Sequence, residues 1–556
     1  INHWLRELSE QNYRGAEYVF GWSFYSQADS RETSQRTDPR QASSDLFISE
    51  ALRFFAPQAD SGSDSDLAEG ELSLRGSLWD RGRDLAVSIS KAGGARQPRE
   101  RQRMRFRWLP PAPQRQCLLV LDGLESLQHR RGDDKGRIRD VALEALLTEL
   151  TEHSRGRCLC VITTREPLRY KEGFDQRVKK IDLNRPLQPE EAVKLVRLAG
   201  IGGDDKELLE RIDQFGGNYP LPTVLAAAYL KHRFQLQPQE PLRPNHLAQL
   251  PAVVDKDSLQ AHVERILGAF AKEISPTQRQ LLDVLSFFKQ LAEPQALAEL
   301  RNARIAGLTD RIGPKDISDD GWSELIDGLR LMRLITTKGA PDGQRGALLD
   351  LHPMVRAYFA AELQAEPARL ACWREGHRVL HRYYLEAARA SRVEAESYAD
   401  LPGQRLVRRQ KEQLDLFQAV VHACLAEDYQ DAWSVFWNEV RQQKRHFSGN
   451  WLGWWSLDQS TLSHFFERQW DRPVRGLSDA VRIHAMNEAG YNLRALGFLH
   501  EALQPLAQSL EEVTQLVRDE AVDSESRQAS PGREELFGLS VFVPVNLSKT
   551  CLPLGR

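Results

Sequence analysis

The chain has 556 residues, of which 41% are hydrophobic and 28% charged, and its formal net charge at pH 7 is −3. A chain of this length is expected to form about three to four domains. The near-neutral charge argues against a nucleic-acid or anionic-membrane partner, and no apolar run approaches the ~18–20 residues of a membrane-spanning helix. Its six cysteines, several of them inside apolar runs, favour buried thiols in a reducing compartment, so we expect a cytoplasmic protein.

The first part of the chain predicts a strand, two helices and long polar connections. Aromatic and β-branched residues predict a buried strand over 18–25, and periodicity predicts helices over 44–55 and 78–90. The polar tract 26–41 is typical of a loop. Arginine is frequent between 95 and 115, which we interpret as a solvated or decayed insertion, with binding to an RNA or DNA backbone as the alternative.

Two apolar runs in this region are each followed by residues suited to catalysis. Residues 117–121 end in Asp122, and a second carboxylate, Glu125, follows three positions on. A buried parallel strand delivers an acid in this way to the carboxyl edge of an α/β sheet, where phosphates and Mg²⁺ bind. The second run, 158–162, is followed by two threonines and an arginine. An acid after one strand, and hydroxyls and a cation after the next, fit the Walker B and sensor positions of a P-loop NTPase.

The phosphate-binding loop of such an enzyme is missing from the sequence. No Gly-x-x-x-x-Gly-Lys-Ser/Thr string occurs, and the glycines at 200–203 with Lys206 predict a turn between helices because no strand precedes them. Residues 1–8 have the pattern of an amphipathic helix without an initiator Met, as expected directly after a P-loop lysine. We therefore expect a chain truncated just after its P-loop, which binds nucleotide poorly and is inactive alone.

The rest of the chain predicts helices with one β-hairpin. Helical patterns recur between 188 and 230, and the stretch 262–360 predicts helices followed by short strands at 334–337 and 348–351, the order of a winged helix. From about 366 onward we expect only helices. The small and large residues over 479–512 have the spacing of a tetratricopeptide-type helix pair.

These patterns predict a multidomain, mostly α fold that contains a truncated α/β P-loop NTPase core with a parallel sheet. The predicted domains are an NTPase core lacking Walker A over 1–187, a helical nucleotide-binding-associated domain over 188–260, a winged-helix domain over 261–365, and helical or tetratricopeptide-like repeats of α-solenoid type over 366–556.

Four short segments, in this order, resemble the STAND class of signalling NTPases, to which NB-ARC and NACHT proteins belong. The likeness is greatest to bacterial members with C-terminal tetratricopeptide repeats, and it covers nearly the whole chain. The segments are Leu118–Glu125 (LLVLDGLE), Val161–Glu166 (VITTRE), Asn218–Leu221 (NYPL) and Leu351–Arg356 (LHPMVR).

The resemblance assigns catalytic roles to the strand ends. It implies that Asp122 holds Mg²⁺, since a hard cation prefers carboxylate oxygens. It implies that Glu125 orients the attacking water; the alternative is a surface glutamate at the start of the next helix. Arg165 is expected to sense the γ-phosphate, supported by a hydrogen bond from Thr164, because a fixed cation stabilises phosphoryl transfer.

The resemblance also assigns two nucleotide contacts later in the chain. Pro220 matches the proline that packs on the adenine, although Gly217 stands one residue further from it than in the family. His352 matches the histidine that contacts the ADP β-phosphate in the resting state. The family's Met-His-Asp reads Leu351, His352, Pro353 here. The alternative for a lone histidine between a strand and a helix is a cap or core residue.

The implied function is an ATP- and ADP-dependent molecular switch whose intact form is a slow ATPase. A protein or peptide ligand on the C-terminal repeats would drive self-association and activate an N-terminal effector absent from this chain, in the setting of bacterial defence signalling. Two alternatives stay open. One is a winged-helix transcription regulator, and the other is a degenerate fragment that serves as a helical-repeat scaffold.

Overall fold

The computed structural model folds into two compact units. The first comprises Ile1–Lys179 and Tyr384–Arg556, and the second comprises Lys180–Tyr383. The loop expected at 26–41 and the arginine-rich stretch 95–115 lie outside the described residues. The structure describes residues 2–24, 44–55, 77–92, 116–129, 135–153, 158–169, 177–183, 187–202, 204, 206, 219–236, 240, 242, 246, 250, 258–289, 291–338, 348–397, 402–523 and 533–552.

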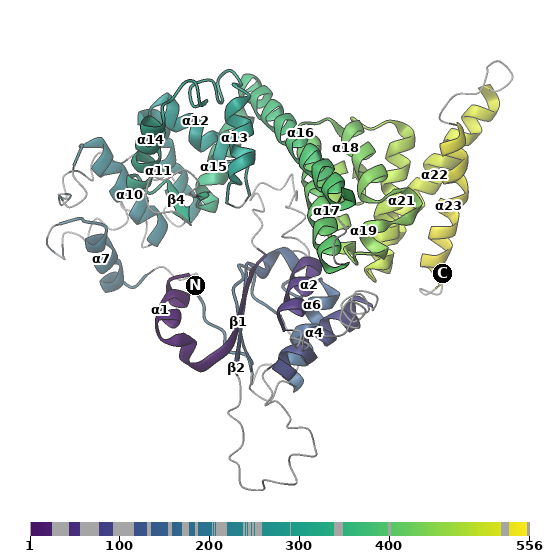
Figure 1. Cartoon of the computed structure of the whole chain (residues 1–556), viewed down its shortest axis with the longest axis horizontal. Coiled ribbons are helices and arrows are strands. Elements are labelled where there is room, and N and C mark those ends of the chain that lie inside the picture. Colours follow the sequence, from purple (N-terminus) through teal and green to yellow (C-terminus); the bar gives the residue numbers. More distant parts are fainter. Residues whose placement is uncertain are drawn as a thin grey trace, which may run out of the picture. The chain divides into compact units, whose positions relative to one another are not determined.

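The first unit contains a parallel sheet of β1 (Ala16–Ser23), β2 (Gln116–Asp122) and β3 (Cys158–Ile162), in the order β1-β2-β3 (Figure 1). From Cys117 to Leu121 the central strand is fully buried, as expected for a parallel strand covered on both faces. Both apolar runs are therefore confirmed as strands, and the strand expected at 18–25 begins two residues earlier.

Helices cover both faces of this sheet. On one face Leu118 and Val120 pack with Leu8 of α1. On the other face Leu119 and Leu121 join the core formed by α2, α4 and α6. The alternation follows from the period of two along a strand. The predicted helices are found with these bounds: α1 (Asn2–Glu10), α2 (Ser44–Phe55), α4 (Leu78–Ala92) and α6 (Val141–His153).

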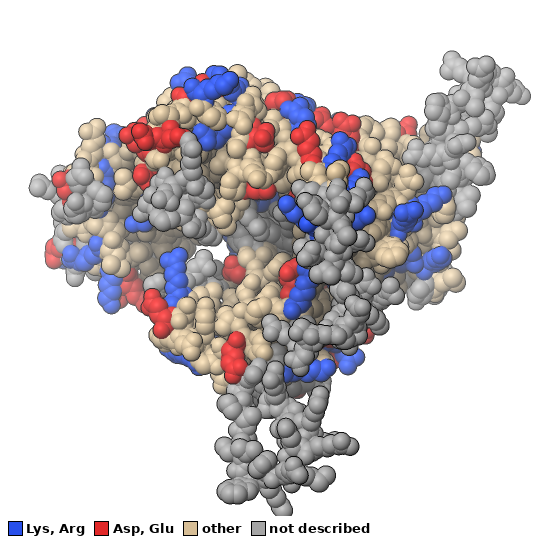
Figure 2. All heavy atoms as spheres, in the orientation of Figure 1, with Lys and Arg blue, Asp and Glu red and all other residues tan. Residues whose placement is uncertain are grey.

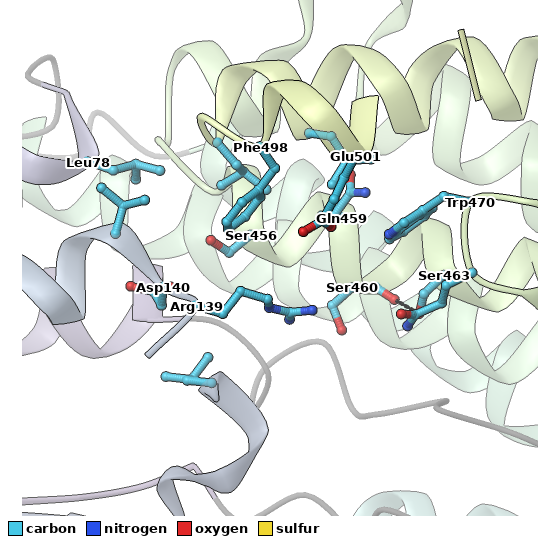
Figure 3. A pocket seen from close by; sticks show the side chains of 15 residues that line it. Leu78, Arg139, Asp140, Ser456, Gln459, Ser460, Ser463, Trp470, Phe498 and Glu501 are labelled. Atoms are coloured by element: carbon cyan, nitrogen blue, oxygen red, sulfur yellow. Dashed lines mark hydrogen bonds between the residues drawn. The ribbon is translucent and has the colours of Figure 1, made fainter. Parts of the chain in front are cut away.

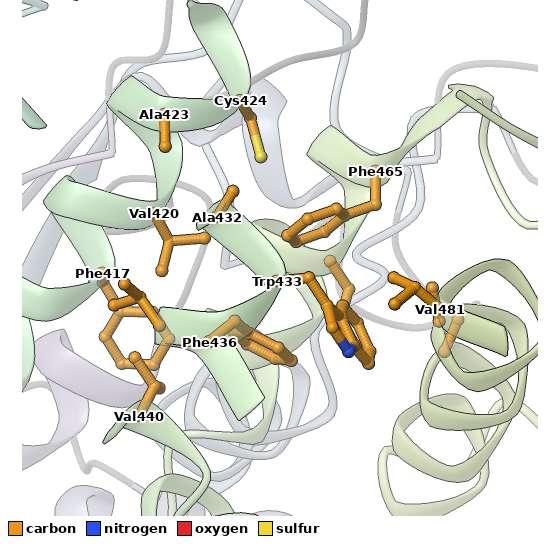
Figure 4. Packing of buried hydrophobic residues seen from close by; sticks show 14 of the residues in the cluster. Phe417, Val420, Ala423, Cys424, Ala432, Trp433, Phe436, Val440, Phe465 and Val481 are labelled. Atoms are coloured by element: carbon orange, nitrogen blue, oxygen red, sulfur yellow. The ribbon is translucent and has the colours of Figure 1, made fainter. Parts of the chain in front are cut away.

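The second part of this unit is helical and has its own core. Trp433, Phe436 and Phe465 pack together there (Figure 4), with the rings of Trp433 and Phe465 edge to face at 5.4 Å. Trp454 is fully buried in this cluster, whereas the nearby Trp451 is 65% exposed. The helices are α17 (Pro402–Leu425), α18 (Tyr429–Val435), α19 (Phe447–Asn450), α20 (Trp455–Leu462), α21 (Asp479–Ala495), α22 (Leu499–Asp523) and α23 (Arg533–Cys551).

The helices α21 and α22 form the pair expected from small and large residues. They approach closely at Gly490, where a Cβ would lie 2.4 Å from Cγ of Leu506. Leu493, Ala502 and Leu506 are buried together between them. Gly497, with φ +87°, terminates the first helix in the left-handed conformation that glycine adopts without strain. Assignment of this pair to the tetratricopeptide class stays a prediction.

The expectation of helices alone beyond 366 is wrong. A small antiparallel hairpin joins β6 (Phe466–Arg468) and β7 (Arg472–Pro473), with Trp470 at φ +61° in its turn. Strands of three and two residues are too short to show a period of two in the sequence.

The second unit consists of short helices and one hairpin. Leu351 of β5 pairs with Ile335 of β4 in an antiparallel ladder. Proline occupies the first turn of several helices, where its missing N–H is not needed, which makes these starts readable from sequence. The elements are α7 (Pro189–Leu198), α10 (Pro220–Arg233), α11 (Leu259–Glu273), α12 (Pro276–Leu285), α13 (Pro294–Asn302), α14 (Asp319–Leu331), β4 (Ile335–Lys338), β5 (Leu348–Leu351), α15 (Pro353–Ala365) and the first part of α16 (Pro367–Ser397). From Tyr384 onward the residues of α16 belong to the first unit.

The predicted helices and strands between 262 and 360 are thus present in the expected order, while their arrangement as a winged helix stays a prediction. Among the described residues, no helix combines the length and the apolar character that crossing a membrane requires.

Candidate functional site

The carboxyl edge of the sheet, which we define as Ser23, Asp122 and Thr163, brings an acid and two hydroxyls together. Ser23 pairs with Asp122 in the register of β1 and β2, and its Oγ donates to Oδ2 of Asp122 at 3.3 Å. Thr163 follows the last residue of β3, and its Oγ1 donates to Oδ1 of Asp122 at 2.5 Å. Both oxygens of the Asp122 carboxylate are therefore oriented by hydroxyls from the flanking strands.

Sequence reasoning assigned the supporting hydroxyl to Thr164, whereas the hydrogen bond to Asp122 comes from Thr163. The Oγ1 of Thr164 instead donates to the side-chain amide of Gln128. Successive side chains beyond a strand point to opposite sides, so a shift of one residue decides which threonine faces the acid. Ser23 and Thr163 were both missed; the signal was their place opposite and beside Asp122 in the register. A nucleotide contact by Thr164 stays a prediction.

Glu125 and Arg165 are also brought together beside this edge. The Nε of Arg165 lies 3.4 Å from Oε1 of Glu125, and the backbone N–H of Arg165 donates to Oε2 at 3.4 Å. Glu125 is the second residue of a short 3-10 helix, Leu124–Leu127, close to the helix start that the alternative expected, but it is 7% exposed rather than on the surface. The Arg165 side chain is 59% exposed, so the ion pair stabilises the fold by at most about 1 kcal/mol and leaves the guanidinium accessible.

The donor set at the carboxyl edge fits Mg²⁺. Among the described residues no group of three or more His, Cys, Asp or Glu is placed to hold a metal ion. Magnesium does not need such a cage, because it is typically held by one or two carboxylates, phosphate oxygens and water. Asp122, with the hydroxyl oxygens of Ser23 and Thr163 beside it, supplies oxygen ligands of this kind.

The cysteines near the sheet are inert rather than catalytic. None of the six cysteines forms a disulfide in the structure, which describes all six. Burial raises the pKa of Cys117 to about 11, with a smaller contribution from the charge of Glu17. Burial likewise raises the pKa of Cys158, its register partner on β3, to about 12. These thiols stay protonated near neutral pH and are poor nucleophiles or metal ligands.

The remaining predicted site residues lie in the second unit. Pro220 is the first residue of α10, and Gly217 lies outside the described residues. His352 is exposed and caps α15, its Nδ1 accepting from the backbone N–H of Met354 at 3.3 Å. The cap alternative for His352 is thus realised, and contacts of Pro220 and His352 with a nucleotide stay predictions, as does their convergence with Asp122.

A buried arginine, Arg356, holds the backbone on either side of His352 in place. Arg356 is 3% exposed and lies in the first turns of α15. Its Nη2 donates to Oδ1 of Asp350 at 2.6 Å and to the carbonyl of Leu351 at 3.1 Å. These charge-assisted bonds fix the end of β5 against the start of α15, which holds the intervening His352 in one place.

In a winged-helix transcription regulator, α14 would be the helix that enters the DNA groove, but here it is mainly a packing element. Leu325 and Leu329 of α14 are buried, and Arg330 pairs with Asp327 at 2.9 Å. The guanidinium of Arg301 lies 3.6 Å from the ring centre of Trp322 rather than facing solvent alone. On the face of the molecule in Figure 2, basic and acidic side chains are interspersed rather than gathered in a basic patch.

Comparison with known proteins gives little beyond this geometry. No known family and no curated protein matches the sequence. A solved structure that the chain resembles is a Signal Transduction ATPase with Numerous Domains (STAND) protein with a tetratricopeptide repeat sensor from Pyrococcus horikoshii. The two are 13% identical, the match covers 99% of this chain and 74% of the other, and the TM-score is 0.40. A TM-score this low does not support a functional assignment, which therefore depends on the residues of the site.

Proposed function

We propose that this chain is part of a STAND-type switch that binds ATP or ADP with Mg²⁺ at the carboxyl edge of its sheet. The observation that carries the proposal is the Asp122 carboxylate at the end of the buried central strand, held by hydroxyls from both neighbouring strands. A nucleotide site at the carboxyl ends of parallel strands is the general arrangement in open α/β sheets.

The residues at this edge divide the work of phosphoryl transfer among them. Asp122 holds Mg²⁺, and Ser23 and Thr163 fix the direction of its oxygens. The bound ion supplies positive charge against the phosphate oxygens. Arg165 presents a second, exposed cation, and Glu125 both positions that guanidinium and accepts a hydrogen bond from the attacking water.

The switch itself involves the second unit. In the resting state, ADP bridges this edge to Pro220 and His352. Because Nδ1 of His352 caps α15, the imidazole faces the β-phosphate through Nε2. A protein or peptide ligand on the C-terminal repeats binds the open state more tightly, shifts the equilibrium, and permits self-association.

The test is Mg²⁺-dependent nucleotide binding by the protein and its variants. We expect Asp122→Asn to weaken Mg²⁺-dependent binding of a fluorescent ADP at least about tenfold, or about 1.4 kcal/mol. The matched control is Asp84→Asn, an exposed acid on α4 that should leave affinity unchanged. Wild-type affinity in both Asp122→Asn and His352→Ala would show that neither residue serves a nucleotide.

A further inference from the structure

A cleft in the first unit lies apart from the carboxyl edge of the sheet. Its walls are the segment before α6 on one side and α20, α21 and the start of α22 on the other (Figure 3). It encloses about 640 Å³ of atom-free space, which includes open solvent at its mouth.

The strongest sign of a ligand here is the side chain of Gln459. It comes from α20, is 8% exposed and lines the cleft (Figure 3). Neither its Oε1 nor its Nε2 has a hydrogen-bond partner among the described residues. A buried polar atom left without a partner costs about 1–3 kcal/mol, and this amide presents both a donor and an acceptor. A bound group that both donates and accepts satisfies it.

Two charges of opposite sign also line the cleft. Arg139 lies in the segment before α6, and Glu501 lies in the first turn of α22. Within the part of the chain that the structure describes, the side chain of Arg139 forms no ion pair. The backbone N–H of Arg139 donates to the carbonyl of Leu127 at 2.8 Å. Among the same described residues, no arginine, lysine or histidine forms an ion pair with Glu501. Most other arginines close to the helical repeats are paired, as Arg441 and Arg482 are.

Much of the remaining lining is aromatic or apolar, and the rest is polar: Asp140, Ser456, Ser460, Ser463 and Gln469. The rings of Trp470 and Phe498 and the aliphatic side chains of Leu78, Leu493 and Leu496 contribute to it. Pockets of this composition bind ligands through apolar contact and use a few convergent polar groups to set orientation. The polar groups that the ligand would use are the Arg139 cation, the Glu501 anion and the Gln459 amide. Asp140 also lines the cleft, but its Oδ1 already accepts hydrogen bonds from Oγ of Ser44 at 2.7 Å and from the backbone N–H of Leu143 at 2.8 Å.

We propose that this cleft binds a zwitterionic peptide of dipeptide size with apolar side chains. Arg139 pairs with the peptide carboxylate, and Glu501 pairs with its ammonium group. The peptide group accepts from and donates to the Gln459 amide. The apolar side chains lie against Trp470 and Phe498. A free peptide is the ligand class that presents a carboxylate, an ammonium group, an amide and apolar groups together.

This proposal is separate from nucleotide binding, since none of the residues that line the cleft belongs to the carboxyl edge and peptide binding needs no nucleotide. Only the further step, in which the peptide acts as the activating ligand, rests on the proposed switch. A failure of nucleotide binding therefore leaves the peptide site standing, and the reverse holds as well.

The test is isothermal titration of the chain with a panel of apolar dipeptides, with leucyl-phenylalanine as the first probe. We expect saturable binding with one site, weakened at least tenfold by Gln459→Met and by Arg139→Gln. Because Gln459→Met replaces an unpaired buried amide by an apolar group of similar shape, its thermal midpoint should equal or exceed that of the wild type. The matched control is Gln504→Met, which removes an exposed amide on α22 that bonds to Asp471.

Two outcomes overturn the proposal. One is the absence of binding below a Kd of about 1 mM across the whole panel, which corresponds to less than about 4 kcal/mol of binding free energy. The other is an affinity that stays the same when a proposed contact is removed. The contact is removed either by Gln459→Met, compared with the wild type, or by blocking both ends of the peptide with acetyl and amide groups, compared with the free peptide. A folded Gln459→Met protein, verified by its thermal midpoint, makes either result decisive.

Discussion

The Oγ1 of Thr163 lies 2.5 Å from Oδ1 of Asp122 and, in turn, accepts a hydrogen bond from the backbone N–H of Gly123 at 2.9 Å. The threonine hydroxyl is thus held by the backbone on one side and holds the acid on the other. One side chain links the end of β3 to the turn after β2.

We expect Thr163→Val to weaken Mg²⁺-dependent nucleotide binding by about tenfold, because the Gly123 N–H and the Asp122 carboxylate lose a shared partner worth about 1–2 kcal/mol. Thr163→Ser keeps the hydroxyl and should restore most of the affinity. Thr164→Val is the matched comparison one residue along the chain. A larger loss for Thr164→Val than for Thr163→Val, measured by titration with fluorescent ADP, would return the supporting role to Thr164.

Arg81 connects the sheet layer to the helical repeats within the first unit. Its Nη1 donates to the carbonyl of Gly453 at 2.8 Å and lies 3.8 Å from Oδ1 of Asp45. The Oδ2 of Asp45 accepts from the backbone N–H of Ser456 at 2.8 Å. Both charged side chains are at most 2% exposed. The contact therefore joins α2 and α4 to the segment before α20.

Arg81→Met should lower the free energy of unfolding by about 3–5 kcal/mol, because Asp45 is left as a buried charge without its cation. Faster amide hydrogen exchange is expected at Ser456. Arg83→Met removes a 53% exposed arginine from the same helix and should cost at most about 1 kcal/mol. Similar losses for the two variants in urea denaturation would mean that burial adds nothing to the Arg81 contact.

Arg441 is the centre of a buried network in the repeats. The guanidinium is fully buried and pairs with Asp458 at 2.5 Å and also with Glu488. We expect Arg441→Met to destabilise the chain by about 3–5 kcal/mol, since two buried carboxylates lose their cation. Arg482→Met, which removes a 34% exposed arginine from α21, should cost at most about 1 kcal/mol. Thermal denaturation followed by circular dichroism separates the two.

His446 makes the stability of this network dependent on pH. Burial, and then the charge of Arg441, lower its pKa to about 4, against a weaker opposing effect of Glu488; His484 adds to the lowering. The unfolded chain, with a histidine pKa near 6.5, therefore binds more protons than the folded chain between about pH 4 and 6.5. Stability from the neutral imidazole is fully present above this window and is lost as the pH falls through it.

We expect the free energy of unfolding to decrease by about 1–3 kcal/mol between pH 6.5 and 4 through this group. His446→Gln keeps a side chain that accepts from Arg441 and removes the titration, so its stability should fall less over the same interval. Parallel pH profiles of wild type and variant in urea would show that His446 titrates alike in both states.

The sequence predicts the sheet well because central parallel strands are continuous apolar runs. The run from Cys158 to Ile162 coincides with β3, and Asp122 ends β2 as expected. The helix start marked by Pro189 also coincides with the structure. Local chemistry alone sets these features, so a single sequence contains them.

Features that depend on register or on distant contacts are not readable in this way. Thr163, and not the predicted Thr164, bonds to Asp122, and this difference depends on a shift of one residue at the end of β3. The contact between Arg81 and Gly453 joins positions 372 residues apart, and nothing local in either segment marks the partner. Gln459 resembles any helical glutamine until the structure shows that it is buried without a partner.

The first unit is discontinuous in the chain, and this has a consequence for its synthesis. Its sheet is complete by Lys179, but the residues that cover α2 and α4 begin only after Tyr384. At ~5–20 residues per second, a ribosome spends roughly 10–40 s on the intervening segment. During that interval the second unit can fold, while the side chains of Arg81 and Asp45 remain hydrated. They are buried only after Gly453 and Ser456 have been synthesised. A nascent chain paused in this interval exposes a face that its own C-terminal third, residues 384–556, covers later, unless a chaperone binds it first.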